Sequence, residues 1–343
     1  MKLILLTNTG KCGTLFIQRL FDGHPFVITF PFAFNFYCAW NTHLKSEDDL
    51  NSFLKKLLEE TSLKEILNFI DREKYIKRVR DYLPNDFEIA KDRKELLEAL
   101  HLAYNFLVSK NRKATHILLN TINVNFLDSV KLAYPDHKHL FLIRDPKNSY
   151  AAYLSSDHSN NPVYKFQFLR NSIHNAVYAQ IFFKRFPEQV RFLRIEDLNE
   201  DLSVTMKNLC KWLEINFSDA LMKETINSQN CNTTPNKLTE RKMSAKIRNT
   251  RWVNSLSSTE VVLIEFLHKE LISEHYTFIS NKFYRNGLMA MLLLLLPNFR
   301  QDRSANHENQ SKKRIFNPQQ WIKIRLSWFS LLRAVARKDR LHF

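Results

Sequence analysis

The stretch that decides the fold is residues 3–25, LILLTNTGKCGTLFIQRLFDGHP. Residues 3–6 are a short apolar run that leads into a polar turn, and residues 15–21 carry apolar side chains at helical spacing. This order predicts a buried strand, a loop and a helix. The chain contains only four glycines, yet Gly10 and Gly13 both fall in this loop. The loop therefore needs a backbone that other residues adopt poorly.

Glycines between a strand and a helix let backbone amides turn toward a phosphate at the helix N-terminus. Lys11 would neutralise that phosphate, and the hydroxyl of Thr14 would donate a hydrogen bond to it. The loop differs from a Walker A motif, because its lysine lies between the glycines and not after the second one. A plain strand–helix turn needs one glycine at most, so we interpret this loop as a phosphate-binding loop.

Three further apolar runs predict strands at residues 116–119, 139–143 and 190–195. The intervening segments are long enough for crossover helices, so we expect an α/β fold with a central parallel sheet flanked by helices. Ligands of such sheets bind beyond the carboxyl ends of the strands. A charged helical segment, about 45–113, is interpreted as an insertion that covers the sheet.

The chain has 343 residues with 51 basic and 35 acidic side chains, a formal charge of +16. This excess suits a phosphate-bearing ligand, an anionic polymer or a membrane surface. Residues 300–343 alone supply +8, so half of the excess lies outside the predicted catalytic domain, 1–285. In the basic extension, 286–343, the amphipathic helix 321–340 suits an anionic membrane interface and equally suits docking on its own domain.

Several classes are disfavoured by the absence of their signatures. The four cysteines form no CxxC pair, which argues against a zinc site and fits a reducing compartment. The apolar run 288–296 is too short to span a bilayer. No zinc-finger or helix-turn-helix signature accompanies the charge, so no nucleic acid is expected. We expect a cytoplasmic protein, peripheral at the inner face of a membrane if helix 321–340 binds lipid.

Four segments in order resemble the sulfotransferases that use 3′-phosphoadenylyl sulfate (PAPS). The loop and helix through residue 25 are similar to the family's 5′-phosphosulfate loop, K-[ST]-G-T-[ST], and its terminal L-D-x-H-P. Residues 141–148, FLIRDPKN, resemble the strand and turn R-[DN]-P-[KR]-D that binds the 3′-phosphate. Residues 192–198 resemble the strand Y-E-D-L, and residues 246–252, KIRNTRW, resemble the late basic loop that closes over the 3′-phosphate.

The resemblance implies a P-loop-like sulfotransferase fold of the bacterial or carbohydrate type, with PAPS as co-substrate and no metal. The family moves the sulfuryl group in line from PAPS to a hydroxyl or amine. Lys11 would act as a catalytic residue by stabilising charge on the transferring group. The implied donor-binding residues are Gly10, Lys11, Cys12, Gly13, Thr14, Leu15, Arg144, Ser149, Lys246, Arg248 and Arg251.

The chain departs from the family pattern at several positions. Cys12 and Leu15 replace a serine or threonine and a threonine in the loop. Ala152 stands where the family has its 3′-phosphate serine, so Ser149, Ser155 or Ser156 would have to substitute. Asn120 and Ile122 occupy the places of a lysine and of a histidine that is catalytic in some members.

These departures leave the general base open. We expect His43 to be the base, because it follows the aromatic stretch 26–37, which would line the acceptor site. His24 is the next candidate, although a cap on the first helix explains it better, and Asp157 with His158 is a further one. The aromatic stretch is interpreted with equal weight as buried core.

By analogy we expect the acceptor to be a glycan or another surface-associated molecule. The main alternative is a non-catalytic nucleotide-binding protein on the same fold. A P-loop kinase and a nucleic-acid binder are weaker alternatives.

Overall fold

The computed structural model describes residues 1–43, 50–60, 63–64, 70–88, 91–109, 113–122, 124–155, 162–227, 229–230 and 251–279. These residues fall into two compact units. The first, here called the sheet unit, combines Met1–Asn8, Gly13–Leu142 and Ile181–Ile247. The second, the loop unit, combines Thr9–Cys12, Ile143–Gln180 and Arg248–Phe343.

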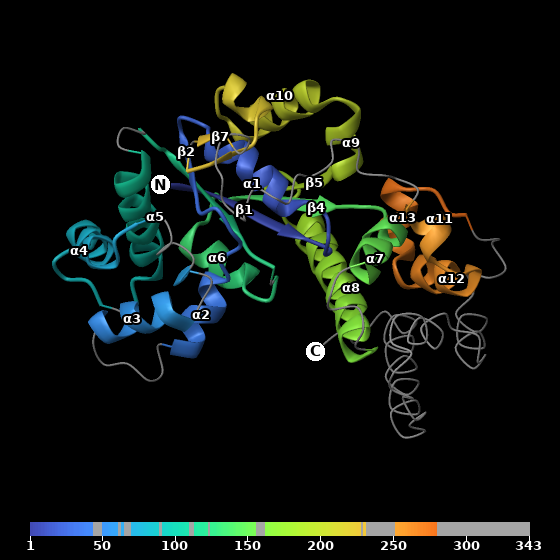
Figure 1. Cartoon of the computed structure of the whole chain (residues 1–343), viewed down its shortest axis with the longest axis horizontal. Coiled ribbons are helices and arrows are strands. Elements are labelled where there is room, and N and C mark those ends of the chain that lie inside the picture. Colours follow the sequence, from blue (N-terminus) through green and yellow to red (C-terminus); the bar gives the residue numbers. More distant parts are fainter. Residues whose placement is uncertain are drawn as a thin grey trace, which may run out of the picture. The chain divides into compact units, whose positions relative to one another are not determined.

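In the described part of the sheet unit, five strands form a parallel sheet flanked by helices, as Figure 1 shows. The central strand β1 is buried along almost its whole length, which explains its unbroken apolar run. Ile4 of β1 pairs with Leu118 on one side and with Lys138 on the other. The strands lie in the order β2 (Val27–Thr29), β3 (His116–Asn120), β1 (Lys2–Asn8), β4 (Lys138–Ile143), β5 (Val190–Arg194).

The four strands expected from the sequence are confirmed, and β2 was not anticipated. The expected strand 190–195 ends one residue early, because Ile195 already begins the short helix α9 (Ile195–Glu200). The first helix is confirmed as α1 (Thr14–Asp22). Other elements are α2 (Phe36–His43), α6 (Leu127–Ala133), α10 (Leu202–Leu213), the 3-10 helix η4 (Asp219–Met222) and the hairpin of β6 (Thr225–Ile226) and β7 (Gln229–Asn230).

The expected helical character of the insertion is confirmed by α3 (Leu50–Glu60), α4 (Arg72–Tyr82) and α5 (Arg93–Ser109). Helix α5 packs against β2, at one edge of the sheet. The buried Tyr75 hydroxyl of α4 donates to the Leu100 carbonyl of α5 at 3.0 Å. These contacts join α4 to α5, and α5 to the edge strand β2, within the sheet unit.

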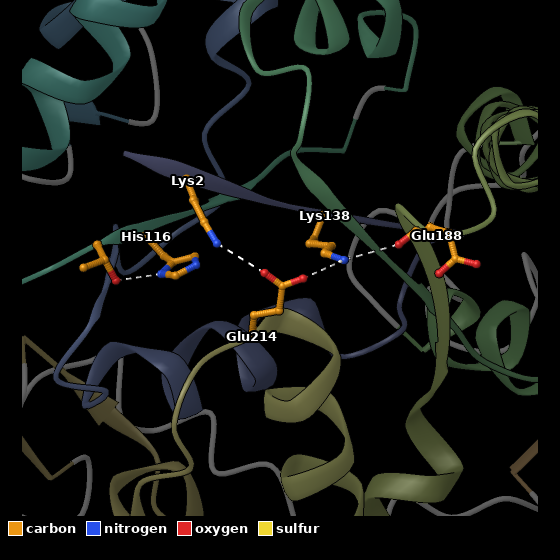
Figure 2. Close-up of polar contacts among 6 residues, drawn as sticks. Lys2, His116, Lys138, Glu188 and Glu214 are labelled. Carbon is orange, nitrogen blue, oxygen red and sulfur yellow. Dashed lines mark hydrogen bonds and ion pairs between the residues drawn. The ribbon is translucent and has the colours of Figure 1, made fainter.

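The amino ends of the strands carry a charged cluster, which Figure 2 shows. Lys2, the first residue of β1, donates from Nζ to Glu214 Oε2 at 3.2 Å, and Lys138 Nζ lies 3.6 Å from Glu214 Oε1. The hydrogen bond from Lys2 is the main reason that the pKa of Glu214 is lowered. The cluster joins β1 and β4 at the edge opposite to the carboxyl ends of the strands.

The loop unit has its own core. It comprises α7 (Pro146–Leu154), the first part of α8 (Pro162–Arg185), α11 (Arg251–Ser255), α12 (Ser258–Leu267) and α13 (Lys269–His275). Helix α12 begins with a capping box in which Ser257 and Glu260 satisfy each other's backbone amides. The buried cluster contains Tyr150, Ala151, Leu169, Ile173, Leu256, Val261, Leu263, Ile264, Phe266 and Leu267, with Trp252 and Phe168 packed against it.

Two kinds of feature are absent from the part of the chain that the structure describes. No helix in this part of the chain is long and apolar enough to cross a membrane. No three His, Cys, Asp or Glu side chains within it are grouped so that they could hold a metal ion. The expected helix 321–340 and Lys246, Arg248, Ser156, Asp157 and His158 lie outside the described residues.

Candidate functional site

The loop after the central strand has the backbone that its glycines predict. Gly10, Lys11 and Gly13 have φ values of 101°, 49° and 80°, all positive. A side chain at Gly10 would also clash with α8, because a Cβ there would lie 2.7 Å from Cε2 of Phe168. Gly10 is therefore required both by its conformation and by the close approach of α8.

The side chain of Cys12 is turned into the loop. It is only 1% exposed, and its Sγ donates to the Gly10 carbonyl at 3.0 Å and lies 3.0 Å from Thr9 Oγ1. The thiol thus takes part in bracing the loop from within. Because the thiol is buried, Cys12 could contact a phosphate only through its backbone amide. The side chain of the neighbouring Lys11 is exposed to solvent.

Two side chains from the turn after β4 hold the backbone of this loop. Arg144, only 8% exposed, donates from Nη1 to the Lys11 carbonyl at 3.2 Å. The hydroxyl of Ser149 donates to the Gly10 carbonyl. The structure therefore places the Arg144 guanidinium against the loop, and binding of the 3′-phosphate by Arg144 stays a prediction. The Ser149 proton is already used within the loop, so binding of a phosphate by Ser149 stays a prediction.

Helix α7 begins in a way that explains its sequence. Asp145 is the N-cap, and its Oδ1 accepts from the Lys147 amide at 2.9 Å, while Pro146 fills the first helical position. Ala152, six residues after Pro146 on the same helix, offers no hydroxyl. The hydroxyl of Ser155 donates to the Ala152 carbonyl at 3.0 Å, so Ser155 is engaged inside its own turn.

Helix α1 starts directly after the loop in the chain. Gly13 is the N-cap residue of α1, and the Gly13 carbonyl accepts from the Phe16 amide at 3.0 Å. Thr14 is half-buried and Leu15 is 38% exposed. The positive end of the helix dipole thus lies at Gly13 and Thr14, the residues expected to hold a phosphate.

The aromatic stretch 26–37 is mainly core. Phe30, Phe34 and Phe36 are each 1% exposed, and their rings pack edge to face at 5.7 Å between centroids. The core interpretation of these rings is therefore confirmed, and they are not available to an acceptor. His43, the expected base, ends α2, but its side chain lies outside the described residues, as does that of Arg251 at the start of α11.

A buried amide network at the carboxyl end of the sheet was missed by the sequence analysis. Gln18 Nε2 donates to Thr29 Oγ1 at 3.1 Å and to the Phe32 carbonyl at 2.8 Å. Asn120 Nδ2 donates to Gln18 Oε1 at 2.7 Å. Asn120, which stands where the family has a lysine, is thus part of a neutral network, and Ile122 is 52% exposed. The signal was a glutamine on the apolar face of α1.

His24 is fully buried, and its backbone amide caps the first helix by donating to the Phe21 carbonyl at 3.0 Å. Its Nδ1 accepts from the Phe26 amide at 3.2 Å, and its Nε2 lies 2.9 Å from the Asn216 carbonyl. The His24 ring thus ties two distant segments together.

Burial lowers the pKa of five histidines, to about 3 for His139 and to about 4 for His101, His116, His137 and His268.

The fold and the site define an α/β protein with a glycine-containing loop of positive φ after the central strand of a parallel sheet. The sulfotransferase family model matches residues 4–219, and the chain belongs to this family. No curated protein matches the chain.

Solved structures that resemble it share little sequence. The sulfotransferase domain of the curacin biosynthetic pathway has 13% identity and a TM-score of 0.49, covering 81% of this chain and 98% of that one. The sulfotransferase domain of the Synechococcus PCC 7002 olefin synthase has 14% identity and a TM-score of 0.46, with coverages of 75% and 88%. Retinol dehydratase in a complex with retinol and PAP has 13% identity and a TM-score of 0.36, with coverages of 82% and 84%.

Proposed function

We propose that this sulfotransferase uses PAPS as donor and transfers the sulfuryl group to a hydroxyl or amine of its acceptor. The observation that carries the proposal is the arrangement of Arg144 and Lys11. The guanidinium is held against a loop with positive φ values, and the lysine side chain of that loop is exposed. A guanidinium and an ammonium in such a setting suit a ligand with two separate anionic groups.

Each part of the loop has a role in the proposed transfer. The loop amides and Thr14 hold the 5′-phosphosulfate, and Arg144 binds the 3′-phosphate together with the basic residues Lys246, Arg248 and Arg251. A bond forms between sulfur and the acceptor oxygen or nitrogen, while the bond from sulfur to the phosphate oxygen breaks. Lys11 stabilises the charge on the transferring group and on the departing phosphate. The acceptor proton passes to a base, for which His43 is proposed, and PAP leaves.

The proposed acceptor is a glycan or another surface-associated molecule, at the cytoplasmic face of a membrane. One observation favours a second candidate, a nucleotide-binding protein without catalysis. Asn120 is buried in a neutral network and Ile122 is apolar, at the two positions where the resemblance places a lysine and a histidine. The two candidates make the same prediction for nucleotide binding and opposite predictions for turnover.

Calorimetric titration with 3′-phosphoadenosine 5′-phosphate (PAP) tests the donor site. We expect micromolar binding to the wild type and affinities at least about tenfold lower for Lys11→Ala and Arg144→Ala, since each removes a charge-assisted contact. Lys2→Ala is the matched control, because it removes an exposed lysine at the opposite edge of the sheet. Failure of the folded wild type to bind PAP would refute the proposal.

A second experiment separates the two candidates. Transfer of radiolabelled sulfate from PAPS is measured over a panel of glycan, phenol and amine acceptors. Turnover that is lost in Lys11→Ala supports the enzyme. Tight PAP binding without turnover on any acceptor supports the non-catalytic alternative.

A further inference from the structure

A fully buried lysine lies close to the candidate donor site. Lys147, in the first turn of α7, is 0% exposed, and its Nζ lies 3.2 Å from Asp145 Oδ1 and 3.3 Å from Glu265 Oε1. Glu265, on α12, is also 0% exposed. The Nζ of Lys147 is 5.9 Å from the ring centroid of Trp252 on α11. Charges are costly to bury unless they are paired, and this site pairs one cation with two carboxylates.

The two carboxylates belong to different segments. Asp145 is the direct neighbour of Arg144 and caps α7. Glu265 belongs to α12, and its Oε1 also accepts from the Ile279 amide at 2.8 Å. Lys147 therefore ties the arginine turn to the helices after it, in addition to the apolar packing of α7 against α11 and α12.

The place of Asp145 in the chain gives this link a consequence for ligand binding. Asp145 directly follows Arg144, whose guanidinium is the proposed binder of the 3′-phosphate. Apolar packing alone is non-directional and allows helices to slip. An ion pair between fixed groups sets one register, because slippage would leave buried charges apart. The Lys147 ammonium also neutralises the Asp145 carboxylate, an anion that would otherwise oppose a phosphate at Arg144.

We propose that Lys147 is a positioning residue for the 3′-phosphate of the nucleotide. Through Asp145 and Glu265 it holds the Arg144 turn in register with α12, so that the Arg144 guanidinium is fixed where it acts on that phosphate. The inference rests on the proposed donor. Being fully buried, Lys147 acts through these groups and touches no ligand itself.

The test compares two nucleotides that differ only in the 3′-phosphate, PAP and adenosine 5′-monophosphate (AMP). Lys147→Met keeps the chain length and removes the charge, and Lys147→Met/Glu265→Gln also removes an acid that would be left uncompensated. Lys91→Met, which removes an exposed lysine, is the matched control. Melting curves and circular dichroism identify the folded variants, and the double variant decides if the single one does not fold.

We expect the folded Lys147 variants to bind PAP at least about tenfold more weakly, with AMP affinity changed less than about twofold. Lys91→Met should bind both nucleotides as the wild type does. Unchanged PAP affinity, or equal losses for PAP and AMP, would overturn the inference, since a merely structural role does not distinguish the two ligands. Absence of PAP binding to the wild type would instead overturn the proposed donor, and the inference with it.

Discussion

The substitution Gly10→Ala should be costly for two separable reasons. The φ of 101° at Gly10 is one that an L-residue adopts poorly, at a cost of about 1–2 kcal/mol. The new Cβ would lie 2.7 Å from Cε2 and 3.0 Å from Cζ of Phe168, and such overpacking costs about 1–3 kcal/mol. Phe168 cannot turn away freely, because its ring stacks on Tyr153 with centroids 4.3 Å apart.

Alanine also lowers the conformational entropy of the unfolded chain, which stabilises the folded state by about 0.4–1 kcal/mol. We therefore expect a net loss of about 3 kcal/mol in the free energy of unfolding. Urea unfolding followed by circular dichroism and by tryptophan fluorescence measures it. Gly23→Ala is the matched control. Gly23 has a φ of −79°, and its Cβ would meet Thr225 Oγ1 only at 3.1 Å, so a change within about 1 kcal/mol is expected there.

The double variant Gly10→Ala/Phe168→Leu divides the cost between the two causes. Leucine lacks the ring atoms that the new Cβ would meet, so a positive coupling of about 1–2 kcal/mol between the two substitutions is expected. The backbone part of the cost should remain. The reasoning is refuted if Gly10→Ala destabilises the protein no more than Gly23→Ala does, and the steric part alone is refuted if the coupling is zero.

Two further predictions concern the sheet unit. Gln18→Leu should lower the free energy of unfolding by about 2–4 kcal/mol, because the buried Asn120 amide loses its acceptor and the Thr29 hydroxyl loses a donor. Thermal denaturation measures this loss, and a value below about 1 kcal/mol would contradict the prediction. His101 is buried and its pKa is lowered to about 4, so the unfolded chain, with a pKa near 6.5, takes up the proton first as pH falls. The neutral His101 ring therefore makes the free energy of unfolding fall as the pH drops from about 6.5 to 4, by about 1.4 kcal/mol per pH unit. His101→Leu should remove this part of the pH dependence, which urea unfolding at several pH values measures. An unchanged slope would show that His101 is not held neutral.

Local patterns were sufficient for much of the fold. The runs at 3–6, 116–119 and 139–143 are continuous because parallel strands are buried on both faces, so the sequence predicts them directly. Gly10 and Gly13 indicate positive φ angles in the loop, and backbone angles depend mainly on the local sequence. The strand β2 was missed, because its three residues lie inside an aromatic run that an acceptor site or a core segment could each explain. The β-branched residues Val27–Thr29, with Pro31 two residues further on, were the available signal.

The candidate site was predicted only in part. Gly10, Lys11 and Arg144 could be identified because each stands in a short motif at the end of a strand. Whether a side chain at such an end faces a ligand or its own loop depends on contacts with segments far along the chain. The engaged hydroxyl of Ser149, which donates to Gly10, is of this kind. The inward thiol of Cys12 contacts Thr9 and Gly10 within the loop itself.

The sequence by itself therefore determined the strands that are buried on both faces, the loop and the family resemblance, because each depends on residues close together in the chain. Only the tertiary structure decided that Gln18 and Asn120 share one buried network and that Lys147 is balanced by Glu265. A buried polar or charged group is tolerated only where partners from other segments satisfy it. The identity of those partners follows from packing in three dimensions, which no local pattern encodes.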